Sequence, residues 1–445
     1  MPIPHVDSSP PFATWQRDLL HLLVGSACGL ALGLVLHGLT PRLVSPDVER
    51  FGAVQGFVQQ AYVRELDGRV LTDAALRGMV ESLDDYSRYY SREELVAMER
   101  ETSGHYRGIG VVFARSLEEG RVLFALPGSP ADRAGIGVGD RLLEIDGQSL
   151  VGLDPAEVHR LLAESDAATV ELLVRPRVGE ERRVTLERAD LVDPTVRHAQ
   201  MLDSELGLGY IALSAFSQET PREFDTAVGE LKRHDLRGLV VDVRGNLGGV
   251  LRSAVSLVNR FVPEGLIVSQ EGRGEPERYE AKAAEAWYSD LPLTVLVDGE
   301  SASASEVFAA ALQEHRAAVV VGSPTYGKGM VQQVRTFRDE AAVKLTTAYY
   351  YTPSGRNLER TVDKAWETGV VPDLEVPLSE LERREVKRYL ASYSPPADAR
   401  ARIEAWEAEA GRELLPRRPP DAQLDAALAL FRGERPGTRL TEVGR

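Results

Sequence analysis

From about residue 205 onward, short apolar runs alternate with helical patterns, and this alternation limits the chain to few folds. Strands are predicted at GLGYIAL, GLVVDVRG, LTVLVDG and AAVVVG, with helices between them. Such an order predicts a sheet with parallel pairs and crossover helices. Three turns rich in glycine or small residues follow these strands, namely DVRGNLGG, DGESASASE and GSPTYGKG. Because functional groups in such sheets commonly lie at the carboxyl ends of strands, the candidate site is expected at these turns.

The last turn has the spacing of a nucleotide-binding loop, G-x-x-x-x-G-K, from Gly322 to Lys328. A true loop of this kind continues with Ser or Thr, but here Gly329 follows. The next residues, MVQQVRTF, predict a strand, which offers no helix N-terminus to a phosphate. Nucleotide binding is therefore kept only as a minor alternative.

Lysine is rare in this chain, since only six of the 52 basic residues are lysine. A lysine between two glycines therefore indicates chemistry that arginine cannot perform, namely the loss of a proton. The neighbours of Lys328 are Gly, Tyr, Gly and Met, and burial among such groups would favour the uncharged amine. Gln332 lies four positions later on the same strand face and could orient that amine.

The SASASE turn offers three serines, Ser301, Ser303 and Ser305, as candidate nucleophiles. A helix start provides N–H groups near a developing oxyanion, so the turn suits acyl transfer. Ser303 and Glu306 also match a capping box, which is a purely structural role. None of the eight histidines can be placed within reach of this turn, so lysine is the natural alternative base.

Residues 104–190 carry short strands and one clear helix, with the run GSPADRAGI followed by GDRLLEIDG. This block resembles a PDZ domain. The resemblance implies that an extended peptide adds as a strand beside the helix and that its C-terminal carboxylate binds backbone N–H groups. The residues that match the carboxylate-binding loop are Gly108, Ile109 and Gly110.

The three turns, together with TYGKGMVQ, LTTAYYYTPSGRNLE, GVVPD and the upstream GMVESLDDYSRYY, resemble the carboxyl-terminal processing peptidases of family S41. The similarity runs from roughly residue 50 to residue 435. It implies a crotonase/ClpP-like α/β peptidase core and no cofactor or metal.

The same resemblance implies a role for several residues. Ser303 would be the nucleophile, Lys328 the general base and Gln332 its support. The oxyanion would be bound by the backbone N–H of Ala304 and of a glycine of NLGG. Both Gly248 and Gly249 fit this second position.

Residues 19–39 contain no charged side chain, and this apolar run is long enough to span a bilayer as a helix. We expect a membrane anchor, with a cleaved signal peptide as the alternative. Either would place the catalytic part on the extracytoplasmic side, which is the periplasm in a Gram-negative bacterium.

Cys28 is the single cysteine, so no internal disulfide is possible. A net charge of −16 makes nucleic acid a poor partner.

The predicted fold is a multidomain α/β protein with five parts. These are a tail with the anchor or signal segment (1–40), a helical segment (41–103), a PDZ domain (104–190), the peptidase core (191–376) and a helical C-terminal segment (377–445). The last segment could mediate dimerisation or pack on the core.

The expected function is that of a serine endopeptidase that captures the C-termini of protein or peptide substrates. A regulatory partner and a homo-oligomer are further expectations. The alternative is an inactive PDZ scaffold.

Overall fold

The computed structural model describes residues 45–114, 120–153, 155–163, 167–338, 341–360 and 369–434. The predicted anchor at 19–39 lies outside these residues. Within the described ranges, none of the helices combines the length and the apolar character needed to cross a bilayer. The chain divides after Met79, and the two parts are described separately.

The first part contains helix α2 (Pro46–Ala61) and most of helix α3 (Gly68–Glu81). Ser45 caps α2 by accepting a hydrogen bond from the N–H of Asp47. The side chain of Gln55 donates to Thr72 Oγ1 over 2.9 Å and joins the two helices. No residue of α2 is buried.

After the last two residues of α3, the second part contains strand β1 (Arg88–Tyr90) and helix α4 (Arg92–Ser103). A capping box starts α4, because the N–H of Ser91 donates to Glu94 and the N–H of Glu94 donates back to Ser91. Gly104 ends the helix with a φ of 73°, a left-handed conformation that glycine adopts without strain.

The PDZ-like block follows, and its elements surround an apolar cluster that includes Ile109, Ile145 and Leu172. The Asp146–Gly147 turn joins β5 to β6 with positive φ at both residues, as a tight hairpin requires. Its elements are β2 (His105–Gly108), β3 (Val111–Phe113), β4 (Val122–Ala125), α5 (Pro130–Arg133), β5 (Arg141–Ile145), β6 (Gln148–Ser149), α6 (Pro155–Ala163), β7 (Thr169–Arg175), β8 (Arg182–Glu187) and β9 (Ala189–Val192).

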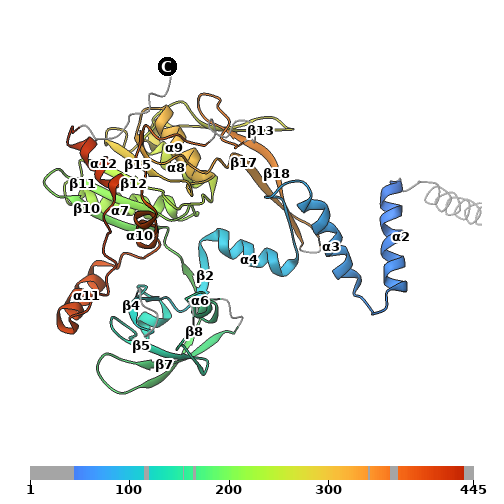
Figure 1. Cartoon of the computed structure of the whole chain (residues 1–445), viewed down its shortest axis with the longest axis horizontal. Coiled ribbons are helices and arrows are strands. Elements are labelled where there is room, and N and C mark those ends of the chain that lie inside the picture. The colour runs from blue at the N-terminus through green and yellow to red at the C-terminus, as the bar shows by residue number, and fades with distance from the viewer. Residues whose placement is uncertain are drawn as a thin grey trace, which may run out of the picture. The chain divides into compact units, whose positions relative to one another are not determined.

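The core sheet has the strand order β10-β11-β12-β15-β16-β19 among the described residues, and all neighbours except β10 and β11 are parallel. The predicted parallel sheet with crossover helices is therefore confirmed (Figure 1). Its strands are β10 (Val196–Asp203), β11 (Leu208–Leu213), β12 (Gly238–Asp242), β15 (Leu293–Val297), β16 (Val319–Gly322) and β19 (Leu374–Glu375).

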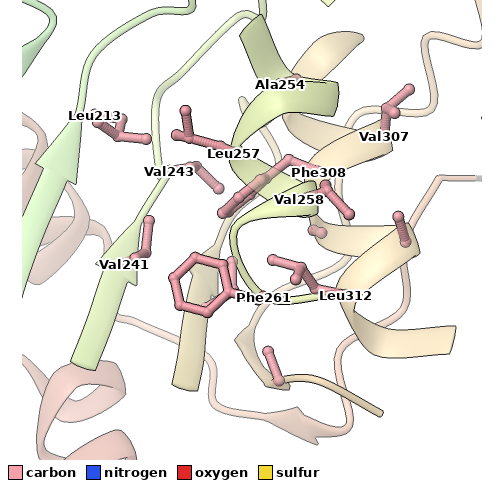
Figure 2. Packing of buried hydrophobic residues seen from close by; sticks show 14 of the residues in the cluster. Leu213, Val241, Val243, Ala254, Leu257, Val258, Phe261, Val307, Phe308 and Leu312 are labelled. Atoms are coloured by element: carbon pink, nitrogen blue, oxygen red, sulfur yellow. The ribbon is translucent and has the colours of Figure 1, made fainter. Parts of the chain in front are cut away.

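Helices cover both faces of this sheet. The strands β11, β12 and β15 are therefore buried at every residue, although alternate side chains point to opposite faces. On one face, α7 (Thr220–Lys232), α8 (Leu251–Asn259) and α9 (Ala304–Glu314) form the main apolar cluster. Figure 2 shows part of this cluster, in which side chains of β12, α8 and α9 meet. On the other face, Val240 and Leu296 pack against α12 (Ala422–Phe431).

A second sheet carries the segment that follows Lys328. Strand β18 (Ala342–Tyr351) pairs with β17 (Met330–Thr336), β13 (Leu266–Gly272) and β1, and β13 also pairs with β14 (Glu277–Glu280). A one-turn helix, η2 (Ala283–Glu285), follows β14. The strand predicted after GSPTYGKG is therefore confirmed as β17.

The C-terminal segment forms α10 (Glu380–Leu390), α11 (Ala397–Ala410) and α12. Besides the contact of α12 with the core, Ile403 and Trp406 of α11 pack against Leu123 and Phe124 of the PDZ-like block. Of the two roles considered for this segment, packing on the rest of the chain is observed.

Candidate active site

The SASASE turn joins β15 to α9 and separates its three serines by their environment. Ser301 is fully buried, and its Oγ donates to the carbonyl of Val243 over 2.8 Å. Ser305 is also buried, and its Oγ donates to the carbonyl of Asn246 over 2.9 Å. Ser303 alone of the three is partly exposed. The geometry therefore leaves Ser303 as the serine available to a substrate.

Ser303 has an unusual backbone conformation, with φ 57° and ψ −116°, immediately before α9 begins at Ala304. A residue with a side chain rarely adopts this conformation, which costs of the order of 1–3 kcal/mol and is often found at functional sites. The N–H of Ser303 donates to Glu306 Oε2 over 2.8 Å, and this hydrogen bond helps to hold the strained turn.

Glu306 also binds the loop that carries Lys328. Its Oε2 accepts from the N–H of Lys328 over 2.8 Å, and its Oε1 accepts from the N–H of Gly327 over 2.7 Å and from the hydroxyl of Thr325 over 2.6 Å. Glu306 is fully buried. Burial raises the pKa of this carboxyl, and its four donors oppose that change. One carboxylate thus fixes the backbones of Ser303 and Lys328 together.

The amine of Lys328 is half-buried, and its Nζ lies 4.5 Å from the ring centroid of Tyr86. Burial lowers the pKa of Lys328, the nearby Lys344 lowers it further, and Glu359 and Glu306 oppose this change. A lowered pKa of Lys328 agrees with the expected uncharged amine. No acidic residue lies close to Lys328 in the sequence, and the fold supplies both of these carboxylates.

Gln332 lies on β17 opposite Thr346, and its side-chain amide donates to the carbonyl of Met330 over 3.2 Å. No hydrogen bond joins it to Lys328 among the described contacts. Its orienting role stays a prediction.

The two candidate oxyanion glycines differ in their surroundings. A Cβ on Gly248 would lie 2.9 Å from both the backbone N of Ala304 and the Cβ of Ser303, so only glycine fits against this turn. However, the N–H of Gly248 donates to Asn246 Oδ1 over 2.9 Å. The N–H groups of Gly249 and Ala304 have no acceptor among the described residues. Proximity favours Gly248 and an available donor favours Gly249, so this choice stays open.

The turn after β12 is held by a buried ionic network that sequence reasoning missed. Arg244 donates through Nη1 and Nη2 to both carboxylate oxygens of Asp421, over 2.9 and 2.6 Å, and it also binds Asp242. Burial alone would raise the pKa of Asp421, but Arg244 and the backbone N–H groups of Leu424 and Gln423 together outweigh burial and lower it. The N-cap of α12 is thereby tied to the DVRGNLGG turn.

A cavity of about 530 Å³ lies beside the carboxyl ends of the core strands and is lined by residues that include Arg244, Asp298 and Glu300. Neither Ser303 nor Lys328 lines it.

In the PDZ-like block, the predicted carboxylate-binding residues lie where β2 ends at Gly108 and in the two-residue link, Ile109 and Gly110, that leads to β3. Ile109 is buried in the core, and its carbonyl accepts from the N–H of Ala131 over 3.0 Å. Gly110 has a φ of 78°. Strand β3 pairs with β4 on one side, and no described strand pairs with its other edge. An open edge of this kind can accept a peptide strand.

Comparison with known proteins decides the family. The profile of peptidase family S41 matches residues 207–376, and a PDZ domain profile matches residues 124–176. A carboxy-terminal-processing protease of Bartonella bacilliformis is 31% identical over 398 residues, which cover 86% of this chain and 88% of that protein. The chain belongs to peptidase family S41.

Further relatives of this S41 peptidase carry related names. The carboxy-terminal processing protease CtpA of Bacillus subtilis is 31% identical over 318 residues, which cover 71% of this chain and 67% of that protein. A solved photosystem II D1 C-terminal processing protease is 27% identical, with a TM-score of 0.45, over 81% of this chain and 97% of that chain.

Family membership makes this S41 peptidase a serine-type protease. The candidate residues Gly248, Gly249, Ser303, Lys328 and Gln332 lie within the matched S41 range. Tyr86 lies outside both matched ranges, although its ring covers the amine of Lys328. The motif DDYSRYY alone carries no signal that marks Tyr86 as a neighbour of Lys328.

Proposed function

We propose that this peptidase cleaves proteins by a Ser-Lys mechanism, with Ser303 as nucleophile and Lys328 as general base. One observation carries the proposal. The buried carboxylate of Glu306 binds the backbone of the strained, partly exposed Ser303 and the backbone of Lys328, whose amine has a lowered pKa. A nucleophile beside a base that can lose its proton is the arrangement that acyl transfer requires.

In this mechanism the neutral amine of Lys328 accepts the proton of the Ser303 hydroxyl while Oγ bonds to the substrate carbonyl carbon. The carbonyl oxygen becomes an oxyanion, which the N–H of Ala304 and that of Gly248 or Gly249 would bind. The lysine then returns the proton to the leaving amine, and water cleaves the acyl-enzyme by the same route. Ser303 and Lys328 share no side-chain hydrogen bond here, and such contacts often tighten only when substrate binds.

We further propose two properties of this peptidase. The first is that the PDZ domain captures substrate C-termini through Gly108, Ile109 and Gly110. The second is that residues 19–39 anchor the enzyme in a membrane, with its catalytic part outside the cytoplasm. The open edge of β3 supports the first statement. The names of the relatives, which process carboxyl termini, also support it. The uncharged run of residues 19–39 supports the second.

The test compares the wild type with Ser303→Ala, Lys328→Ala and a matched control, Ser301→Ala. Each is incubated with peptides that end in a free carboxylate or in an amide. We expect kcat/KM to fall by at least about a thousandfold in the first two variants, since they remove the nucleophile or its base. Turnover by Ser303→Ala equal to that of the wild type would refute the mechanism. Equal cleavage of peptides with a C-terminal carboxylate and with a C-terminal amide would refute the capture of C-termini but would leave the Ser-Lys mechanism untouched.

A further inference from the structure

Among the described residues, the aromatic ring that lies over the amine of Lys328 is that of Tyr86. The ring centroid of Tyr86 lies 4.5 Å from Nζ, and Nζ makes no hydrogen bond to any described residue. At this distance the ring face attracts an ammonium strongly and a neutral amine much less. The ring of Tyr86 therefore lies directly against the charged end of Lys328.

The turn that carries Tyr86 is firmly held. Asp84 Oδ1 accepts from the N–H of Tyr86 over 2.8 Å and from the N–H of Ser87 over 2.7 Å. The Oγ of buried Ser87 accepts from the N–H of Thr346 over 3.1 Å, and Thr346 also donates to Asp84 over 3.2 Å. Thr346 belongs to β18, the neighbour of the strand that follows Lys328. The ring and the lysine loop are therefore supported by one sheet.

Charged groups from several elements face the same amine. Lys344 of β18 opposes its protonation, whereas Glu359, beyond β18, and Glu306 of α9 favour it. Glu306 already binds four donors of the protein, so its charge is engaged elsewhere. The ring of Tyr86 adds a contribution that needs no charged group and that is much stronger when Lys328 is protonated.

The hydroxyl of Tyr86 stays protonated, because burial and then the neighbouring Tyr326 raise its pKa. The ring is therefore neutral at every pH at which the enzyme would work. Its effect on Lys328 is that of an uncharged aromatic face.

We propose that Tyr86 is a positioning residue for Lys328. Its ring holds the amine in place and stabilises the ammonium that forms when Lys328 takes the proton from Ser303. This role rests on the proposed Ser-Lys chemistry. It assigns a function to the DDYSRYY segment, which lies outside both matched profiles.

The test follows the ionisation of Lys328 directly in the full chain. Lysine labelled with ¹³C at the ε carbon gives few signals, because the chain has six lysines, and Lys328→Arg identifies the signal of Lys328. In Tyr86→Leu, the pKa of Lys328 is expected to fall by about half a unit to one and a half units, since the ring no longer stabilises the ammonium. The matched control, Tyr86→Phe, keeps the ring and is expected to titrate like the wild type.

Activity supplies a second readout. In Tyr86→Leu the acidic limb of the kcat/KM profile is expected to move down by the same amount, and the plateau to fall several-fold. Tyr86→Trp, with its more strongly attracting ring, is expected to move both titrations upward and remains informative if the leucine variant does not fold.

The outcomes separate two failures. A pKa of Lys328 that is unchanged or raised in Tyr86→Leu, or lowered equally in Tyr86→Phe, overturns the role of the ring. A wild type that cleaves no peptide overturns the proposed function, while the lysine titration still decides the role of Tyr86.

Discussion

Glu306 joins the two candidate catalytic segments through a single side chain. Its two oxygens accept from Ser303, Lys328, Gly327 and Thr325, and Thr325 in turn accepts from the N–H of Val370 over 2.7 Å. A capping glutamate on an ordinary helix would serve only its own first turn. Here the same residue type also ties the backbone of the candidate nucleophile, Ser303, to that of the candidate base, Lys328.

The variant Glu306→Gln tests this role. An amide nitrogen would replace one acceptor and face buried N–H groups, so the free energy of unfolding is expected to fall by about 3 kcal/mol. The kcat/KM is expected to fall further than stability alone explains, because Ser303 and Lys328 lose their common support. Urea unfolding and peptide cleavage measure the two effects. The exposed Glu230→Gln on α7 is the control, and an effect no larger than that of this control would contradict the assignment.

At the scale of elements, α10 is held against β10 by a buried histidine. His198 of β10 stacks on Tyr389 of α10 with ring centroids 4.2 Å apart, and its Nε2 lies 3.0 Å from the carbonyl of Tyr389. Burial lowers the pKa of His198 to about 4. The imidazole is therefore neutral in the folded protein over most of the accessible pH range.

This contact predicts a defined loss of stability in acid. Below pH 6.5 the unfolded chain binds a proton at His198, whereas the folded protein does so only near pH 4. The free energy of unfolding is therefore expected to decrease as the pH falls from 6.5 to 4, by about 3 kcal/mol in total from this group. Urea unfolding at several pH values measures it. The variant His198→Gln should lose this part of the slope, and an unchanged slope would refute the contribution.

At the scale of the whole molecule, the order of strands made much of the site predictable. Parallel strands bring their carboxyl ends to one edge, so the turns after β12, β15 and β16 were expected to meet, and the structure places Gly248 against Ser303. The contacts of Tyr86 with Lys328 and of Arg244 with Asp421 were not predictable. Each joins segments that are distant in the chain, and local periodicity carries no information about which side chains meet.

The link from Arg244 to Asp421 makes the candidate site depend on the C-terminal helix. Arg244 is 4% exposed, and Asp421 supplies two of its hydrogen bonds while capping α12. Removing one partner of a buried ion pair typically costs about 3–5 kcal/mol, and the lower end, about 3 kcal/mol, applies here because Asp242 still pairs with Arg244.

The variant Asp421→Ala is therefore expected to lower the free energy of unfolding by about that amount and also to reduce kcat/KM, since the DVRGNLGG turn loses its support. Asp425→Ala, at an exposed position of the same helix, is the matched control and should change both quantities little. Cleavage assays at a temperature where both variants are folded separate the two effects. If Asp421→Ala unfolds more easily but cleaves like the wild type at that temperature, the C-terminal helix stabilises the fold without shaping the DVRGNLGG turn.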